Sequence, residues 1–114
     1  MAPLRVGPLP GEALAAAARL HGEVLPRVLE ALAAKPPHLT LIFPLADYTH
    51  RAWRLSAVQA LAREYAPIRI NALASDCGPA IAAALGYLGS AEGVTGQLLE
   101  LDDTGAGEVV CSPA

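Results

Sequence analysis

The chain is short of basic residues and of cysteines, and both shortages restrict what it can be. It contains eight Lys and Arg against eleven Asp and Glu, for a formal net charge of −3. A nucleic-acid-binding domain needs a basic face, so this composition excludes nucleic acid as a partner. Cys77 and Cys111 are the only cysteines, and they have neither CxxC spacing nor a local histidine. They fit reduced thiols in a cytosolic protein better than a disulfide scaffold or a metal site.

The sequence also shows no segment that would direct the chain to a membrane. Its opening, MAPLRVGPLPG, has no charged region followed by an apolar run, which a signal peptide requires. No uncharged apolar run approaches the roughly 18 residues that span a bilayer. We therefore expect a cytoplasmic protein with no membrane contact.

Apolar residues, by contrast, are abundant. Hydrophobic residues make up 54% of the chain and charged residues 17%, against roughly 45–50% and 25% in an average soluble domain. A small monomer cannot readily hide this much apolar surface, so we expect a partner to cover part of it. The alternative is that runs of alanine inflate the count without creating an exposed patch.

The apolar pattern predicts helices alternating with short strands. A helical pattern over 12–34 contains Pro26, which predicts a kink near 22–25 or two abutting helices. Its buried face is expected to comprise Leu14, Ala17, Ala18, His21, Leu25, Val28, Leu29 and Leu32. The later elements are expected as a strand over 39–43, a helix from Asp47 to about Tyr65, a strand over 68–74, a helix over 80–88 ended by Gly89, a strand over 97–101 and a tail from 103.

Connections of this length between strands predict parallel pairing, as in α/β folds. The length of 114 residues suits one domain, so residues 1–114 are expected to form a single small α/β domain with three parallel strands. A fourth strand is expected at most around 4–6, because prolines keep the first eleven residues irregular. Without it, the outer edge of the strand over 39–43 would be bare, and bare apolar edges associate.

Three segments carry a family resemblance: LAREYAPIRINALA at 61–74, AIAAALGYLGS at 80–90 and VTGQLLELD at 94–102. Together they resemble the C-terminal half of a short-chain dehydrogenase/reductase subunit. The resemblance implies a Rossmann-like, three-layer domain that lacks the N-terminal, dinucleotide-binding half. The glycine-rich phosphate turn of a Rossmann fold, with its strand and helix, is absent from the sequence.

The resemblance also implies where catalytic residues should stand. Members of the family transfer a proton through a Tyr whose pKa is lowered by a Lys one helical turn later, beside a Ser. An ungapped count places the Tyr position at Asp47 and the Lys position at Arg51, while Tyr48 is one residue out of register. No Ser lies in the short segment before Asp47. The family's supporting Asn falls near Ala13, so orthodox dehydrogenase activity and a nicotinamide cofactor are not expected.

A residual polar site remains a hypothesis. Its candidates are Asp47, Tyr48 and Arg51, with Ser75 and Asp76 standing where the family has a Pro-Gly that closes over the nicotinamide. The alternative is that Asp47 caps a helix whose exposed first turns hold His50 and Arg51. The three histidines share no metal-ligand spacing, so no metal is expected.

Two classes of function follow. The first is a pseudoenzyme that forms oligomers, at least a dimer with itself, or that docks onto a full-length dehydrogenase as a structural or regulatory subunit. The second is an NAD(P)-dependent oxidoreductase or ligand-binding protein whose residual site another subunit completes. A folded product without any role stays open. Family members usually associate through paired long helices and through the last strand and its helix, and Trp53 is the expected anchor of such an interface.

Overall fold

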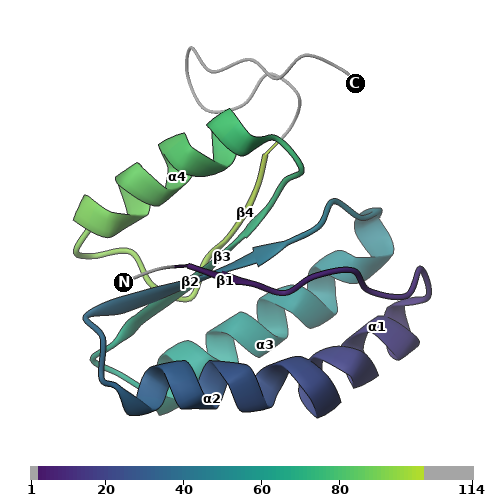
Figure 1. Ribbon diagram of the computed structural model, residues 1–114, viewed down its shortest axis with the longest axis horizontal. Helices are drawn as coiled ribbons and strands as arrows, with labels where there is room; N and C mark the ends of the chain where they lie inside the picture. The colour runs from purple at the N-terminus through teal and green to yellow at the C-terminus, as the bar shows by residue number, and fades with distance from the viewer. Residues whose placement is uncertain (1–2, 102–114) are drawn as a thin grey trace.

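Four parallel strands form a sheet between two layers of helices in the computed structural model, which describes residues 3–101 (Figure 1). The elements in chain order are β1 (Leu4–Arg5), α1 (Ala13–Arg19), the π-helical η1 (Leu20–Val24), α2 (Leu25–Ala33), β2 (His38–Phe43), the 3₁₀ turn η2 (Tyr48–His50), α3 (Arg51–Glu64), β3 (Arg69–Ala74), α4 (Gly78–Ser90) and β4 (Leu98–Glu100). The strands lie in the order β1-β2-β3-β4. This confirms the small Rossmann-like sheet predicted from the sequence. The tail expected from residue 103 lies outside the described residues.

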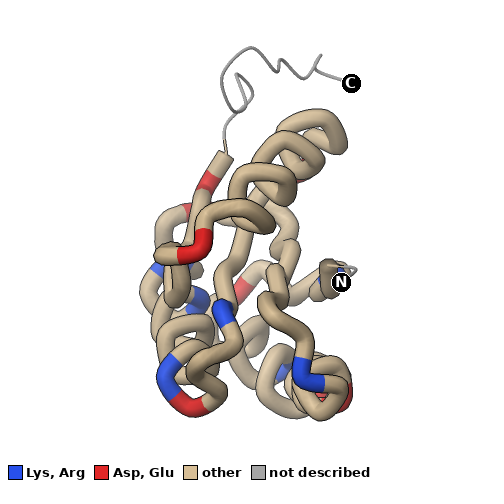
Figure 2. Tube along the Cα trace, turned by 90° about the vertical axis from the view of Figure 1, so that its left-hand side faces the viewer, with Lys and Arg blue, Asp and Glu red and all other residues tan. Residues whose placement is uncertain are grey.

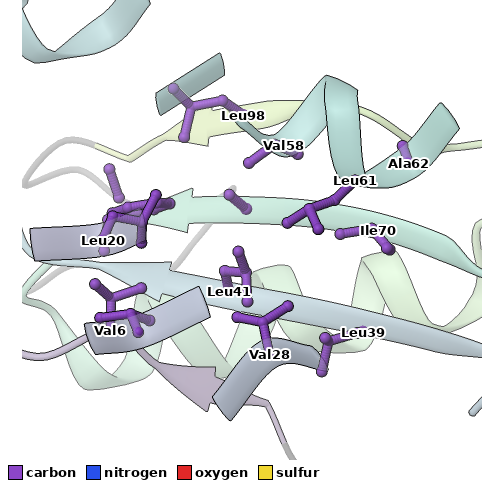
Figure 3. Close-up of a cluster of buried hydrophobic side chains, with 14 of the residues drawn as sticks. Val6, Leu20, Val28, Leu39, Leu41, Val58, Leu61, Ala62, Ile70 and Leu98 are labelled. Atoms are coloured by element: carbon purple, nitrogen blue, oxygen red, sulfur yellow. The ribbon is translucent and has the colours of Figure 1, made fainter. Parts of the chain in front are cut away.

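Each face of the sheet has its own core. Figure 1 shows α1, α2 and α3 on one face and α4 on the other. The larger core joins side chains of β2 and β3 to the first three helices, including Leu39, Leu41, Val58 and Ile70 (Figure 3). The smaller core joins Ile42 and Leu73 to Ile81, Ala84 and Leu88 of α4. Because β2 is covered on both sides, residues 39–43 read in the sequence as a largely apolar run. The strand β3 is also covered on both sides, but it carries Arg69 and Asn71, which bond to the end of α4 and to the loop before β4.

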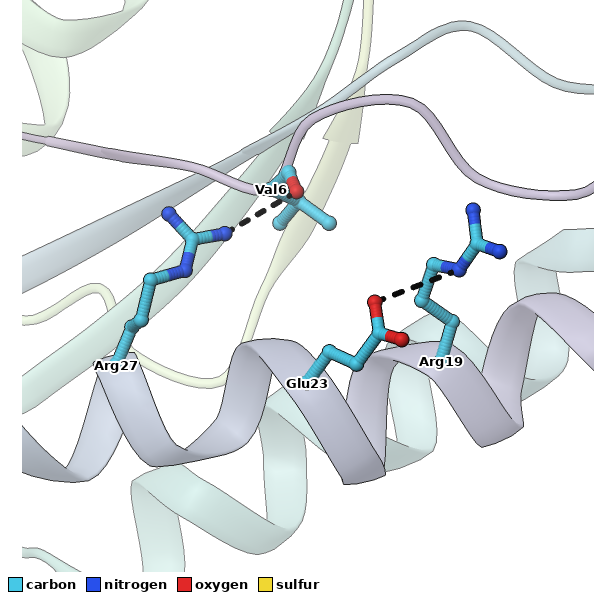
Figure 4. Close-up of polar contacts among 4 residues, drawn as sticks. All are labelled: Val6, Arg19, Glu23 and Arg27. Atoms are coloured by element: carbon cyan, nitrogen blue, oxygen red, sulfur yellow. Dashed lines mark hydrogen bonds and ion pairs between the residues drawn. The ribbon is translucent and has the colours of Figure 1, made fainter.

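The strand β1 covers the outer edge of β2, which the sequence left in question. Leu4 and Arg5 pair with Leu41 and Ile42, and the Val6 amide donates to the Ile42 carbonyl at 2.9 Å. Nη2 of Arg27 in α2 donates to the Val6 carbonyl at 3.3 Å (Figure 4). The two-residue strand is therefore held by the helix as well as by the sheet.

The bent helix of residues 13–33 confirms the predicted interruption near Pro26, but the predicted buried face is wrong throughout its first half and at Leu29, which is 40% exposed. The buried residues are spaced by four: Ala16, Leu20, Val24, Val28 and Leu32. Leu14 is 83% exposed. Each four-residue step overshoots an α-helical turn by about 40°, and the wider π-helical turn at Leu20–Val24 offsets part of that drift.

The C-terminal end of α4 differs from the prediction that Gly89 ends it. The helix continues to Ser90, and the guanidinium of Arg69 donates to the carbonyls of Leu88 (2.9 Å), Gly89 (3.3 Å) and Ala91 (2.6 Å). A charged side chain from the neighbouring strand therefore satisfies the last carbonyls, which a glycine cap would otherwise do.

Cys77 immediately precedes α4 and is buried. It is disulfide-bonded, so the expectation of a reduced thiol is wrong for this residue. Cys111 lies outside the described residues.

Charged residues are few and interspersed over the described chain. Figure 2 shows positive and negative positions spread along the trace without a continuous run of one sign. Among residues 3–101, no helix has the length and hydrophobicity needed to cross a bilayer.

Asn71 of β3 fixes the loop that leads into β4. Its side chain donates to the Val94 carbonyl at 3.0 Å and accepts from the Gln97 amide at 3.0 Å. Within the same loop Gly96 adopts φ +72°, and a Cβ there would lie 3.6 Å from the Cβ of Ala62. The TGQ motif noted in the sequence is therefore a turn that requires glycine.

Gly96→Ala is expected to destabilise the protein by about 1–2 kcal/mol, because alanine is strained at this left-handed φ. Gly93→Ala is the matched control, since nothing lies within 4 Å of its added Cβ and we expect a change within roughly 0.5 kcal/mol. Urea denaturation measures both. Equal effects of the two changes would contradict the assigned turn.

Candidate functional site

The carboxyl ends of the strands bring two loops together, the segment 44–47 after β2 and the segment 75–77 after β3. In open α/β sheets this edge is where ligands bind. The Leu45 amide donates to Oδ1 of Asp76 at 3.4 Å, which joins the two loops. Ser75 is buried, and its hydroxyl oxygen accepts from the Cys77 amide at 3.0 Å.

Asp47 begins the helical segment that leads into α3, as predicted. Its Oδ1 accepts from the Thr49 amide at 2.9 Å and from the Thr49 hydroxyl. The hydrogen bonds from the Thr49 side chain and then the Thr49 amide lower the pKa of this carboxyl below its usual value. Asp47 therefore stands as an ionised cap where the family resemblance implied a tyrosine.

No hydrogen bond within residues 3–101 joins Arg51 to Tyr48, and the two side chains have different surroundings. Nη1 of Arg51 forms an exposed ion pair with Oε1 of Glu100 at 2.9 Å, which ties α3 to β4. Tyr48 is 87% exposed. The cation at the lysine position is thus engaged with a carboxylate, and the displaced phenol lies in solvent.

Two cavities described at this edge divide the sequence-predicted candidates between them. A cavity of about 360 Å³ is lined by Ser75 and Asp76 together with Arg5 of β1. A second cavity of about 300 Å³ is lined by Asp47. Pro44 lies between the two and lines both. Tyr48 and Arg51 line neither of them, so the five candidates do not converge on one cavity.

Two polar residues of the second cavity were missed or misplaced by sequence reasoning. His50, expected in an exposed turn, is only 3% exposed. Its Nε2 contacts the Gly11 carbonyl at 2.9 Å, and its Nδ1 contacts Nε1 of Trp53 at 3.1 Å. Arg54, which the sequence analysis did not single out, is also 3% exposed.

The sequence does contain a signal for Arg54. Arg54, Val58 and Leu61 follow the three-to-four spacing of the buried face of α3, and all three are buried. A charged residue inside an apolar stripe marks a polar group that the core must accommodate. For His50 no comparable signal exists, because its burial depends on the Pro8–Gly11 loop folding over it.

Trp53 is half-buried at this same end of α3 and packs against the larger core. Its ring meets Phe43 edge-on, with centroids 5.9 Å apart, and lies 6.1 Å from the His50 ring. It does not line the cavity between α2 and α3. Among the described residues, no group of three or more His, Cys, Asp or Glu is placed to hold a metal ion.

Comparison with known proteins identifies the family. A family model described as SDR-like, short chain dehydrogenase-like protein, matches residues 4–101. The chain belongs to this family. No curated protein and no solved structure matches the chain. The matched residues include all four strands, β1 to β4, so the family model covers the whole described sheet.

The cap and the exposed ion pair predict effects of different size when their residues are substituted. Asp47→Ala should destabilise the protein by about 1 kcal/mol through the lost cap. Arg51→Ala should change stability by no more than roughly 0.5 kcal/mol, because it breaks only an exposed ion pair. Chemical denaturation at neutral pH measures both. An Arg51→Ala variant that folds normally but loses a ligand-dependent activity would instead favour a residual site around Asp47 and Arg51.

Proposed function

We propose that this short chain dehydrogenase-like protein works without a dinucleotide, as a pseudoenzyme whose role is to form oligomers. The positions matching the family's Tyr and Lys hold Asp47 and Arg51, and both are engaged in structural contacts with Thr49 and Glu100. These contacts support the proposal because they occupy the groups that proton transfer would need.

The observation that carries the proposal is an apolar groove between α2 and α3. It has a volume of about 330 Å³. Its lining residues are Leu20, His21, Leu25, Val28, Leu29, Leu41, Ala57, Ala60, Leu61, Glu64 and Tyr65. Leu29 projects from α2 and is 40% exposed, while Ala57 and Ala60 leave a depression along α3.

A second copy of this chain is the occupant we propose for the groove. A two-fold interface uses the same patch on both subunits, so the patch must be complementary to itself. Here the projecting Leu29 of one subunit can enter the alanine depression of its partner, and the reverse contact follows by symmetry. The apolar excess of the sequence supports the same conclusion.

Light scattering on the purified protein tests the proposal. A dimer at micromolar concentration should give about twice the 11.7 kDa mass of one chain. A monomer at high micromolar concentration would contradict self-association. Co-purification of that monomer with a full-length dehydrogenase would replace the second copy by a different partner.

The alternative is an NAD(P)-dependent oxidoreductase or ligand-binding protein with a residual site completed by another subunit. The cavities beside Asp47 and Asp76 are the observation in its favour. Titration calorimetry with NAD and NADP separates the two functions, because micromolar affinity for either nucleotide would contradict the proposed pseudoenzyme.

A further inference from the structure

A buried arginine that forms no ion pair within residues 3–101 lines the cavity between residues 8–11 and the segment 44–47. Arg54 is 3% exposed and lines this cavity. Of the ion pairs within residues 3–101, none includes Arg54. A buried charge is normally paired, because withdrawing it from water is unfavourable.

The contacts of Arg54 satisfy only part of its guanidinium. Nη1 donates to the Pro44 carbonyl at 2.7 Å, and the guanidinium carbon lies 4.6 Å from the Phe43 ring centroid and 5.7 Å from that of Trp53. Nε is buried without a hydrogen-bond partner. A guanidinium has five N–H donors, and the rings can offset its charge but accept none of those in-plane protons.

The unused donors of the guanidinium differ in their access to the cavity. Neither Nε nor Nη2 has a hydrogen-bond partner among the described residues, but Nε is closed off from the cavity while Nη2 is not buried. A carboxylate suits the accessible Nη2, because a hydrogen bond between a guanidinium and an ionised acceptor is stronger than one to a neutral group.

No hydrogen bond within residues 3–101 joins the other polar side chains of the cavity, His50 and Asp47, to Arg54. Trp53 Nε1 can only donate, so Nδ1 of His50 accepts from it, and Nε2 carries the proton that goes to the Gly11 carbonyl. His50 therefore holds the loop in place through Gly11. Asp47 directs its Oδ1 to Thr49.

The remaining lining limits the size and charge of a ligand. The cavity of about 300 Å³ has apolar walls from Pro8, Leu9, Pro10 and Leu45, which suits a small molecule with a short hydrocarbon part. The ionised Asp47 on the same cavity disfavours a dianion such as phosphate more than it disfavours a monoanion.

We propose that Arg54 anchors a binding site for a small monocarboxylate, whose hydrocarbon part lies against the proline-rich loop and Leu45. The carboxylate accepts from Nη2 and pairs with the charge of the guanidinium. This inference goes beyond the proposed assembly role, and it stands or falls separately, because this cavity and the α2–α3 groove share no lining residue.

The test is thermal unfolding with butyrate, its neutral isostere butyramide, inorganic phosphate and chloride, at constant ionic strength. Butyrate should raise the melting temperature, by about 5 °C for each tenfold increase in its concentration above Kd. Butyramide and chloride should not. Two results overturn the proposal. One is the absence of a shift with butyrate up to roughly 100 mM, since a Kd above that concentration is too weak to represent a binding site. The other is a larger shift with phosphate than with butyrate.

Two variants assign the effect to Arg54. Arg54→Met should weaken butyrate binding at least about tenfold, whereas Arg63→Met, an exposed change of the same charge on α3, should leave it unchanged. Equal binding by wild type and Arg54→Met overturns the site. Should Arg54→Met fail to fold, NMR of the arginine Nε–H groups in the wild type decides. Butyrate must shift the Arg54 signal and not that of Arg63, and any other result counts against the proposal.

Discussion

Phe43→Ala is expected to lower the free energy of unfolding by about 3–5 kcal/mol, the range for truncating a buried aromatic. Phe43 is fully buried at the end of β2. Its ring contacts two side chains of α3: Trp53 meets it edge-on, and the Arg54 guanidinium lies over it. Truncation therefore leaves a cavity and also removes the aromatic face beneath a buried cation.

Ile42→Val is the matched control for this prediction. Ile42 precedes Phe43 in β2, is equally buried and faces the other core beneath α4. Removing one methyl group there should cost about 0.5–1.5 kcal/mol. Urea denaturation at one fixed protein concentration measures both changes, since association would otherwise alter the apparent stability. A Phe43→Ala cost no larger than that of Ile42→Val would contradict the role given to the ring.

The fold could be predicted because local sequence signals and the tertiary structure agree. Leu39–Phe43 is an apolar β-prone run, and it forms a strand covered on both faces. Pro26 marked the interruption of the long helix, and Ala66-Pro67 marked the end of the next one. The three segments that resemble the dehydrogenase family then predicted the order of β3, α4 and β4.

The first half of the long helix was predicted on the wrong face for a physical reason. The expected stripe assumed 3.6 residues per turn through Leu14 and His21. The structure inserts a π-helical segment at Leu20–Val24, so the buried positions instead recur every four residues. Pro26 predicted an interruption here, but not that the buried positions would recur every four residues, because that spacing depends on packing against the sheet.

The candidate site was predictable only where a single residue makes its own local contact. Asp47 was recognised as a cap because an Asx residue bonds an amide two residues later. His50 is buried where it contacts Gly11, 39 residues earlier in the sequence. Arg54 is buried where α3 places it over the Phe43 ring. Those contacts are long-range, and propensity does not encode them.

Leu29→Glu is expected to convert the proposed dimer to a monomer, raising the dissociation constant at least about 100-fold. The change puts a carboxylate into an apolar groove, and an unpaired buried charge costs about 3–5 kcal/mol. Two-fold symmetry introduces the charge twice in each dimer. Since Leu29 is 40% exposed in the single subunit, stability of the isolated chain should change little.

Leu14→Glu provides the control, and the pair of variants decides where the interface lies. Leu14 belongs to the same bent helix and is 83% exposed, yet it does not line the groove. It should therefore leave the dissociation constant unchanged. Sedimentation equilibrium over a range of concentrations measures both variants. If Leu29→Glu stays dimeric, or if Leu14→Glu dissociates the dimer equally well, the subunits associate through another surface, and the groove between α2 and α3 needs a different partner or none.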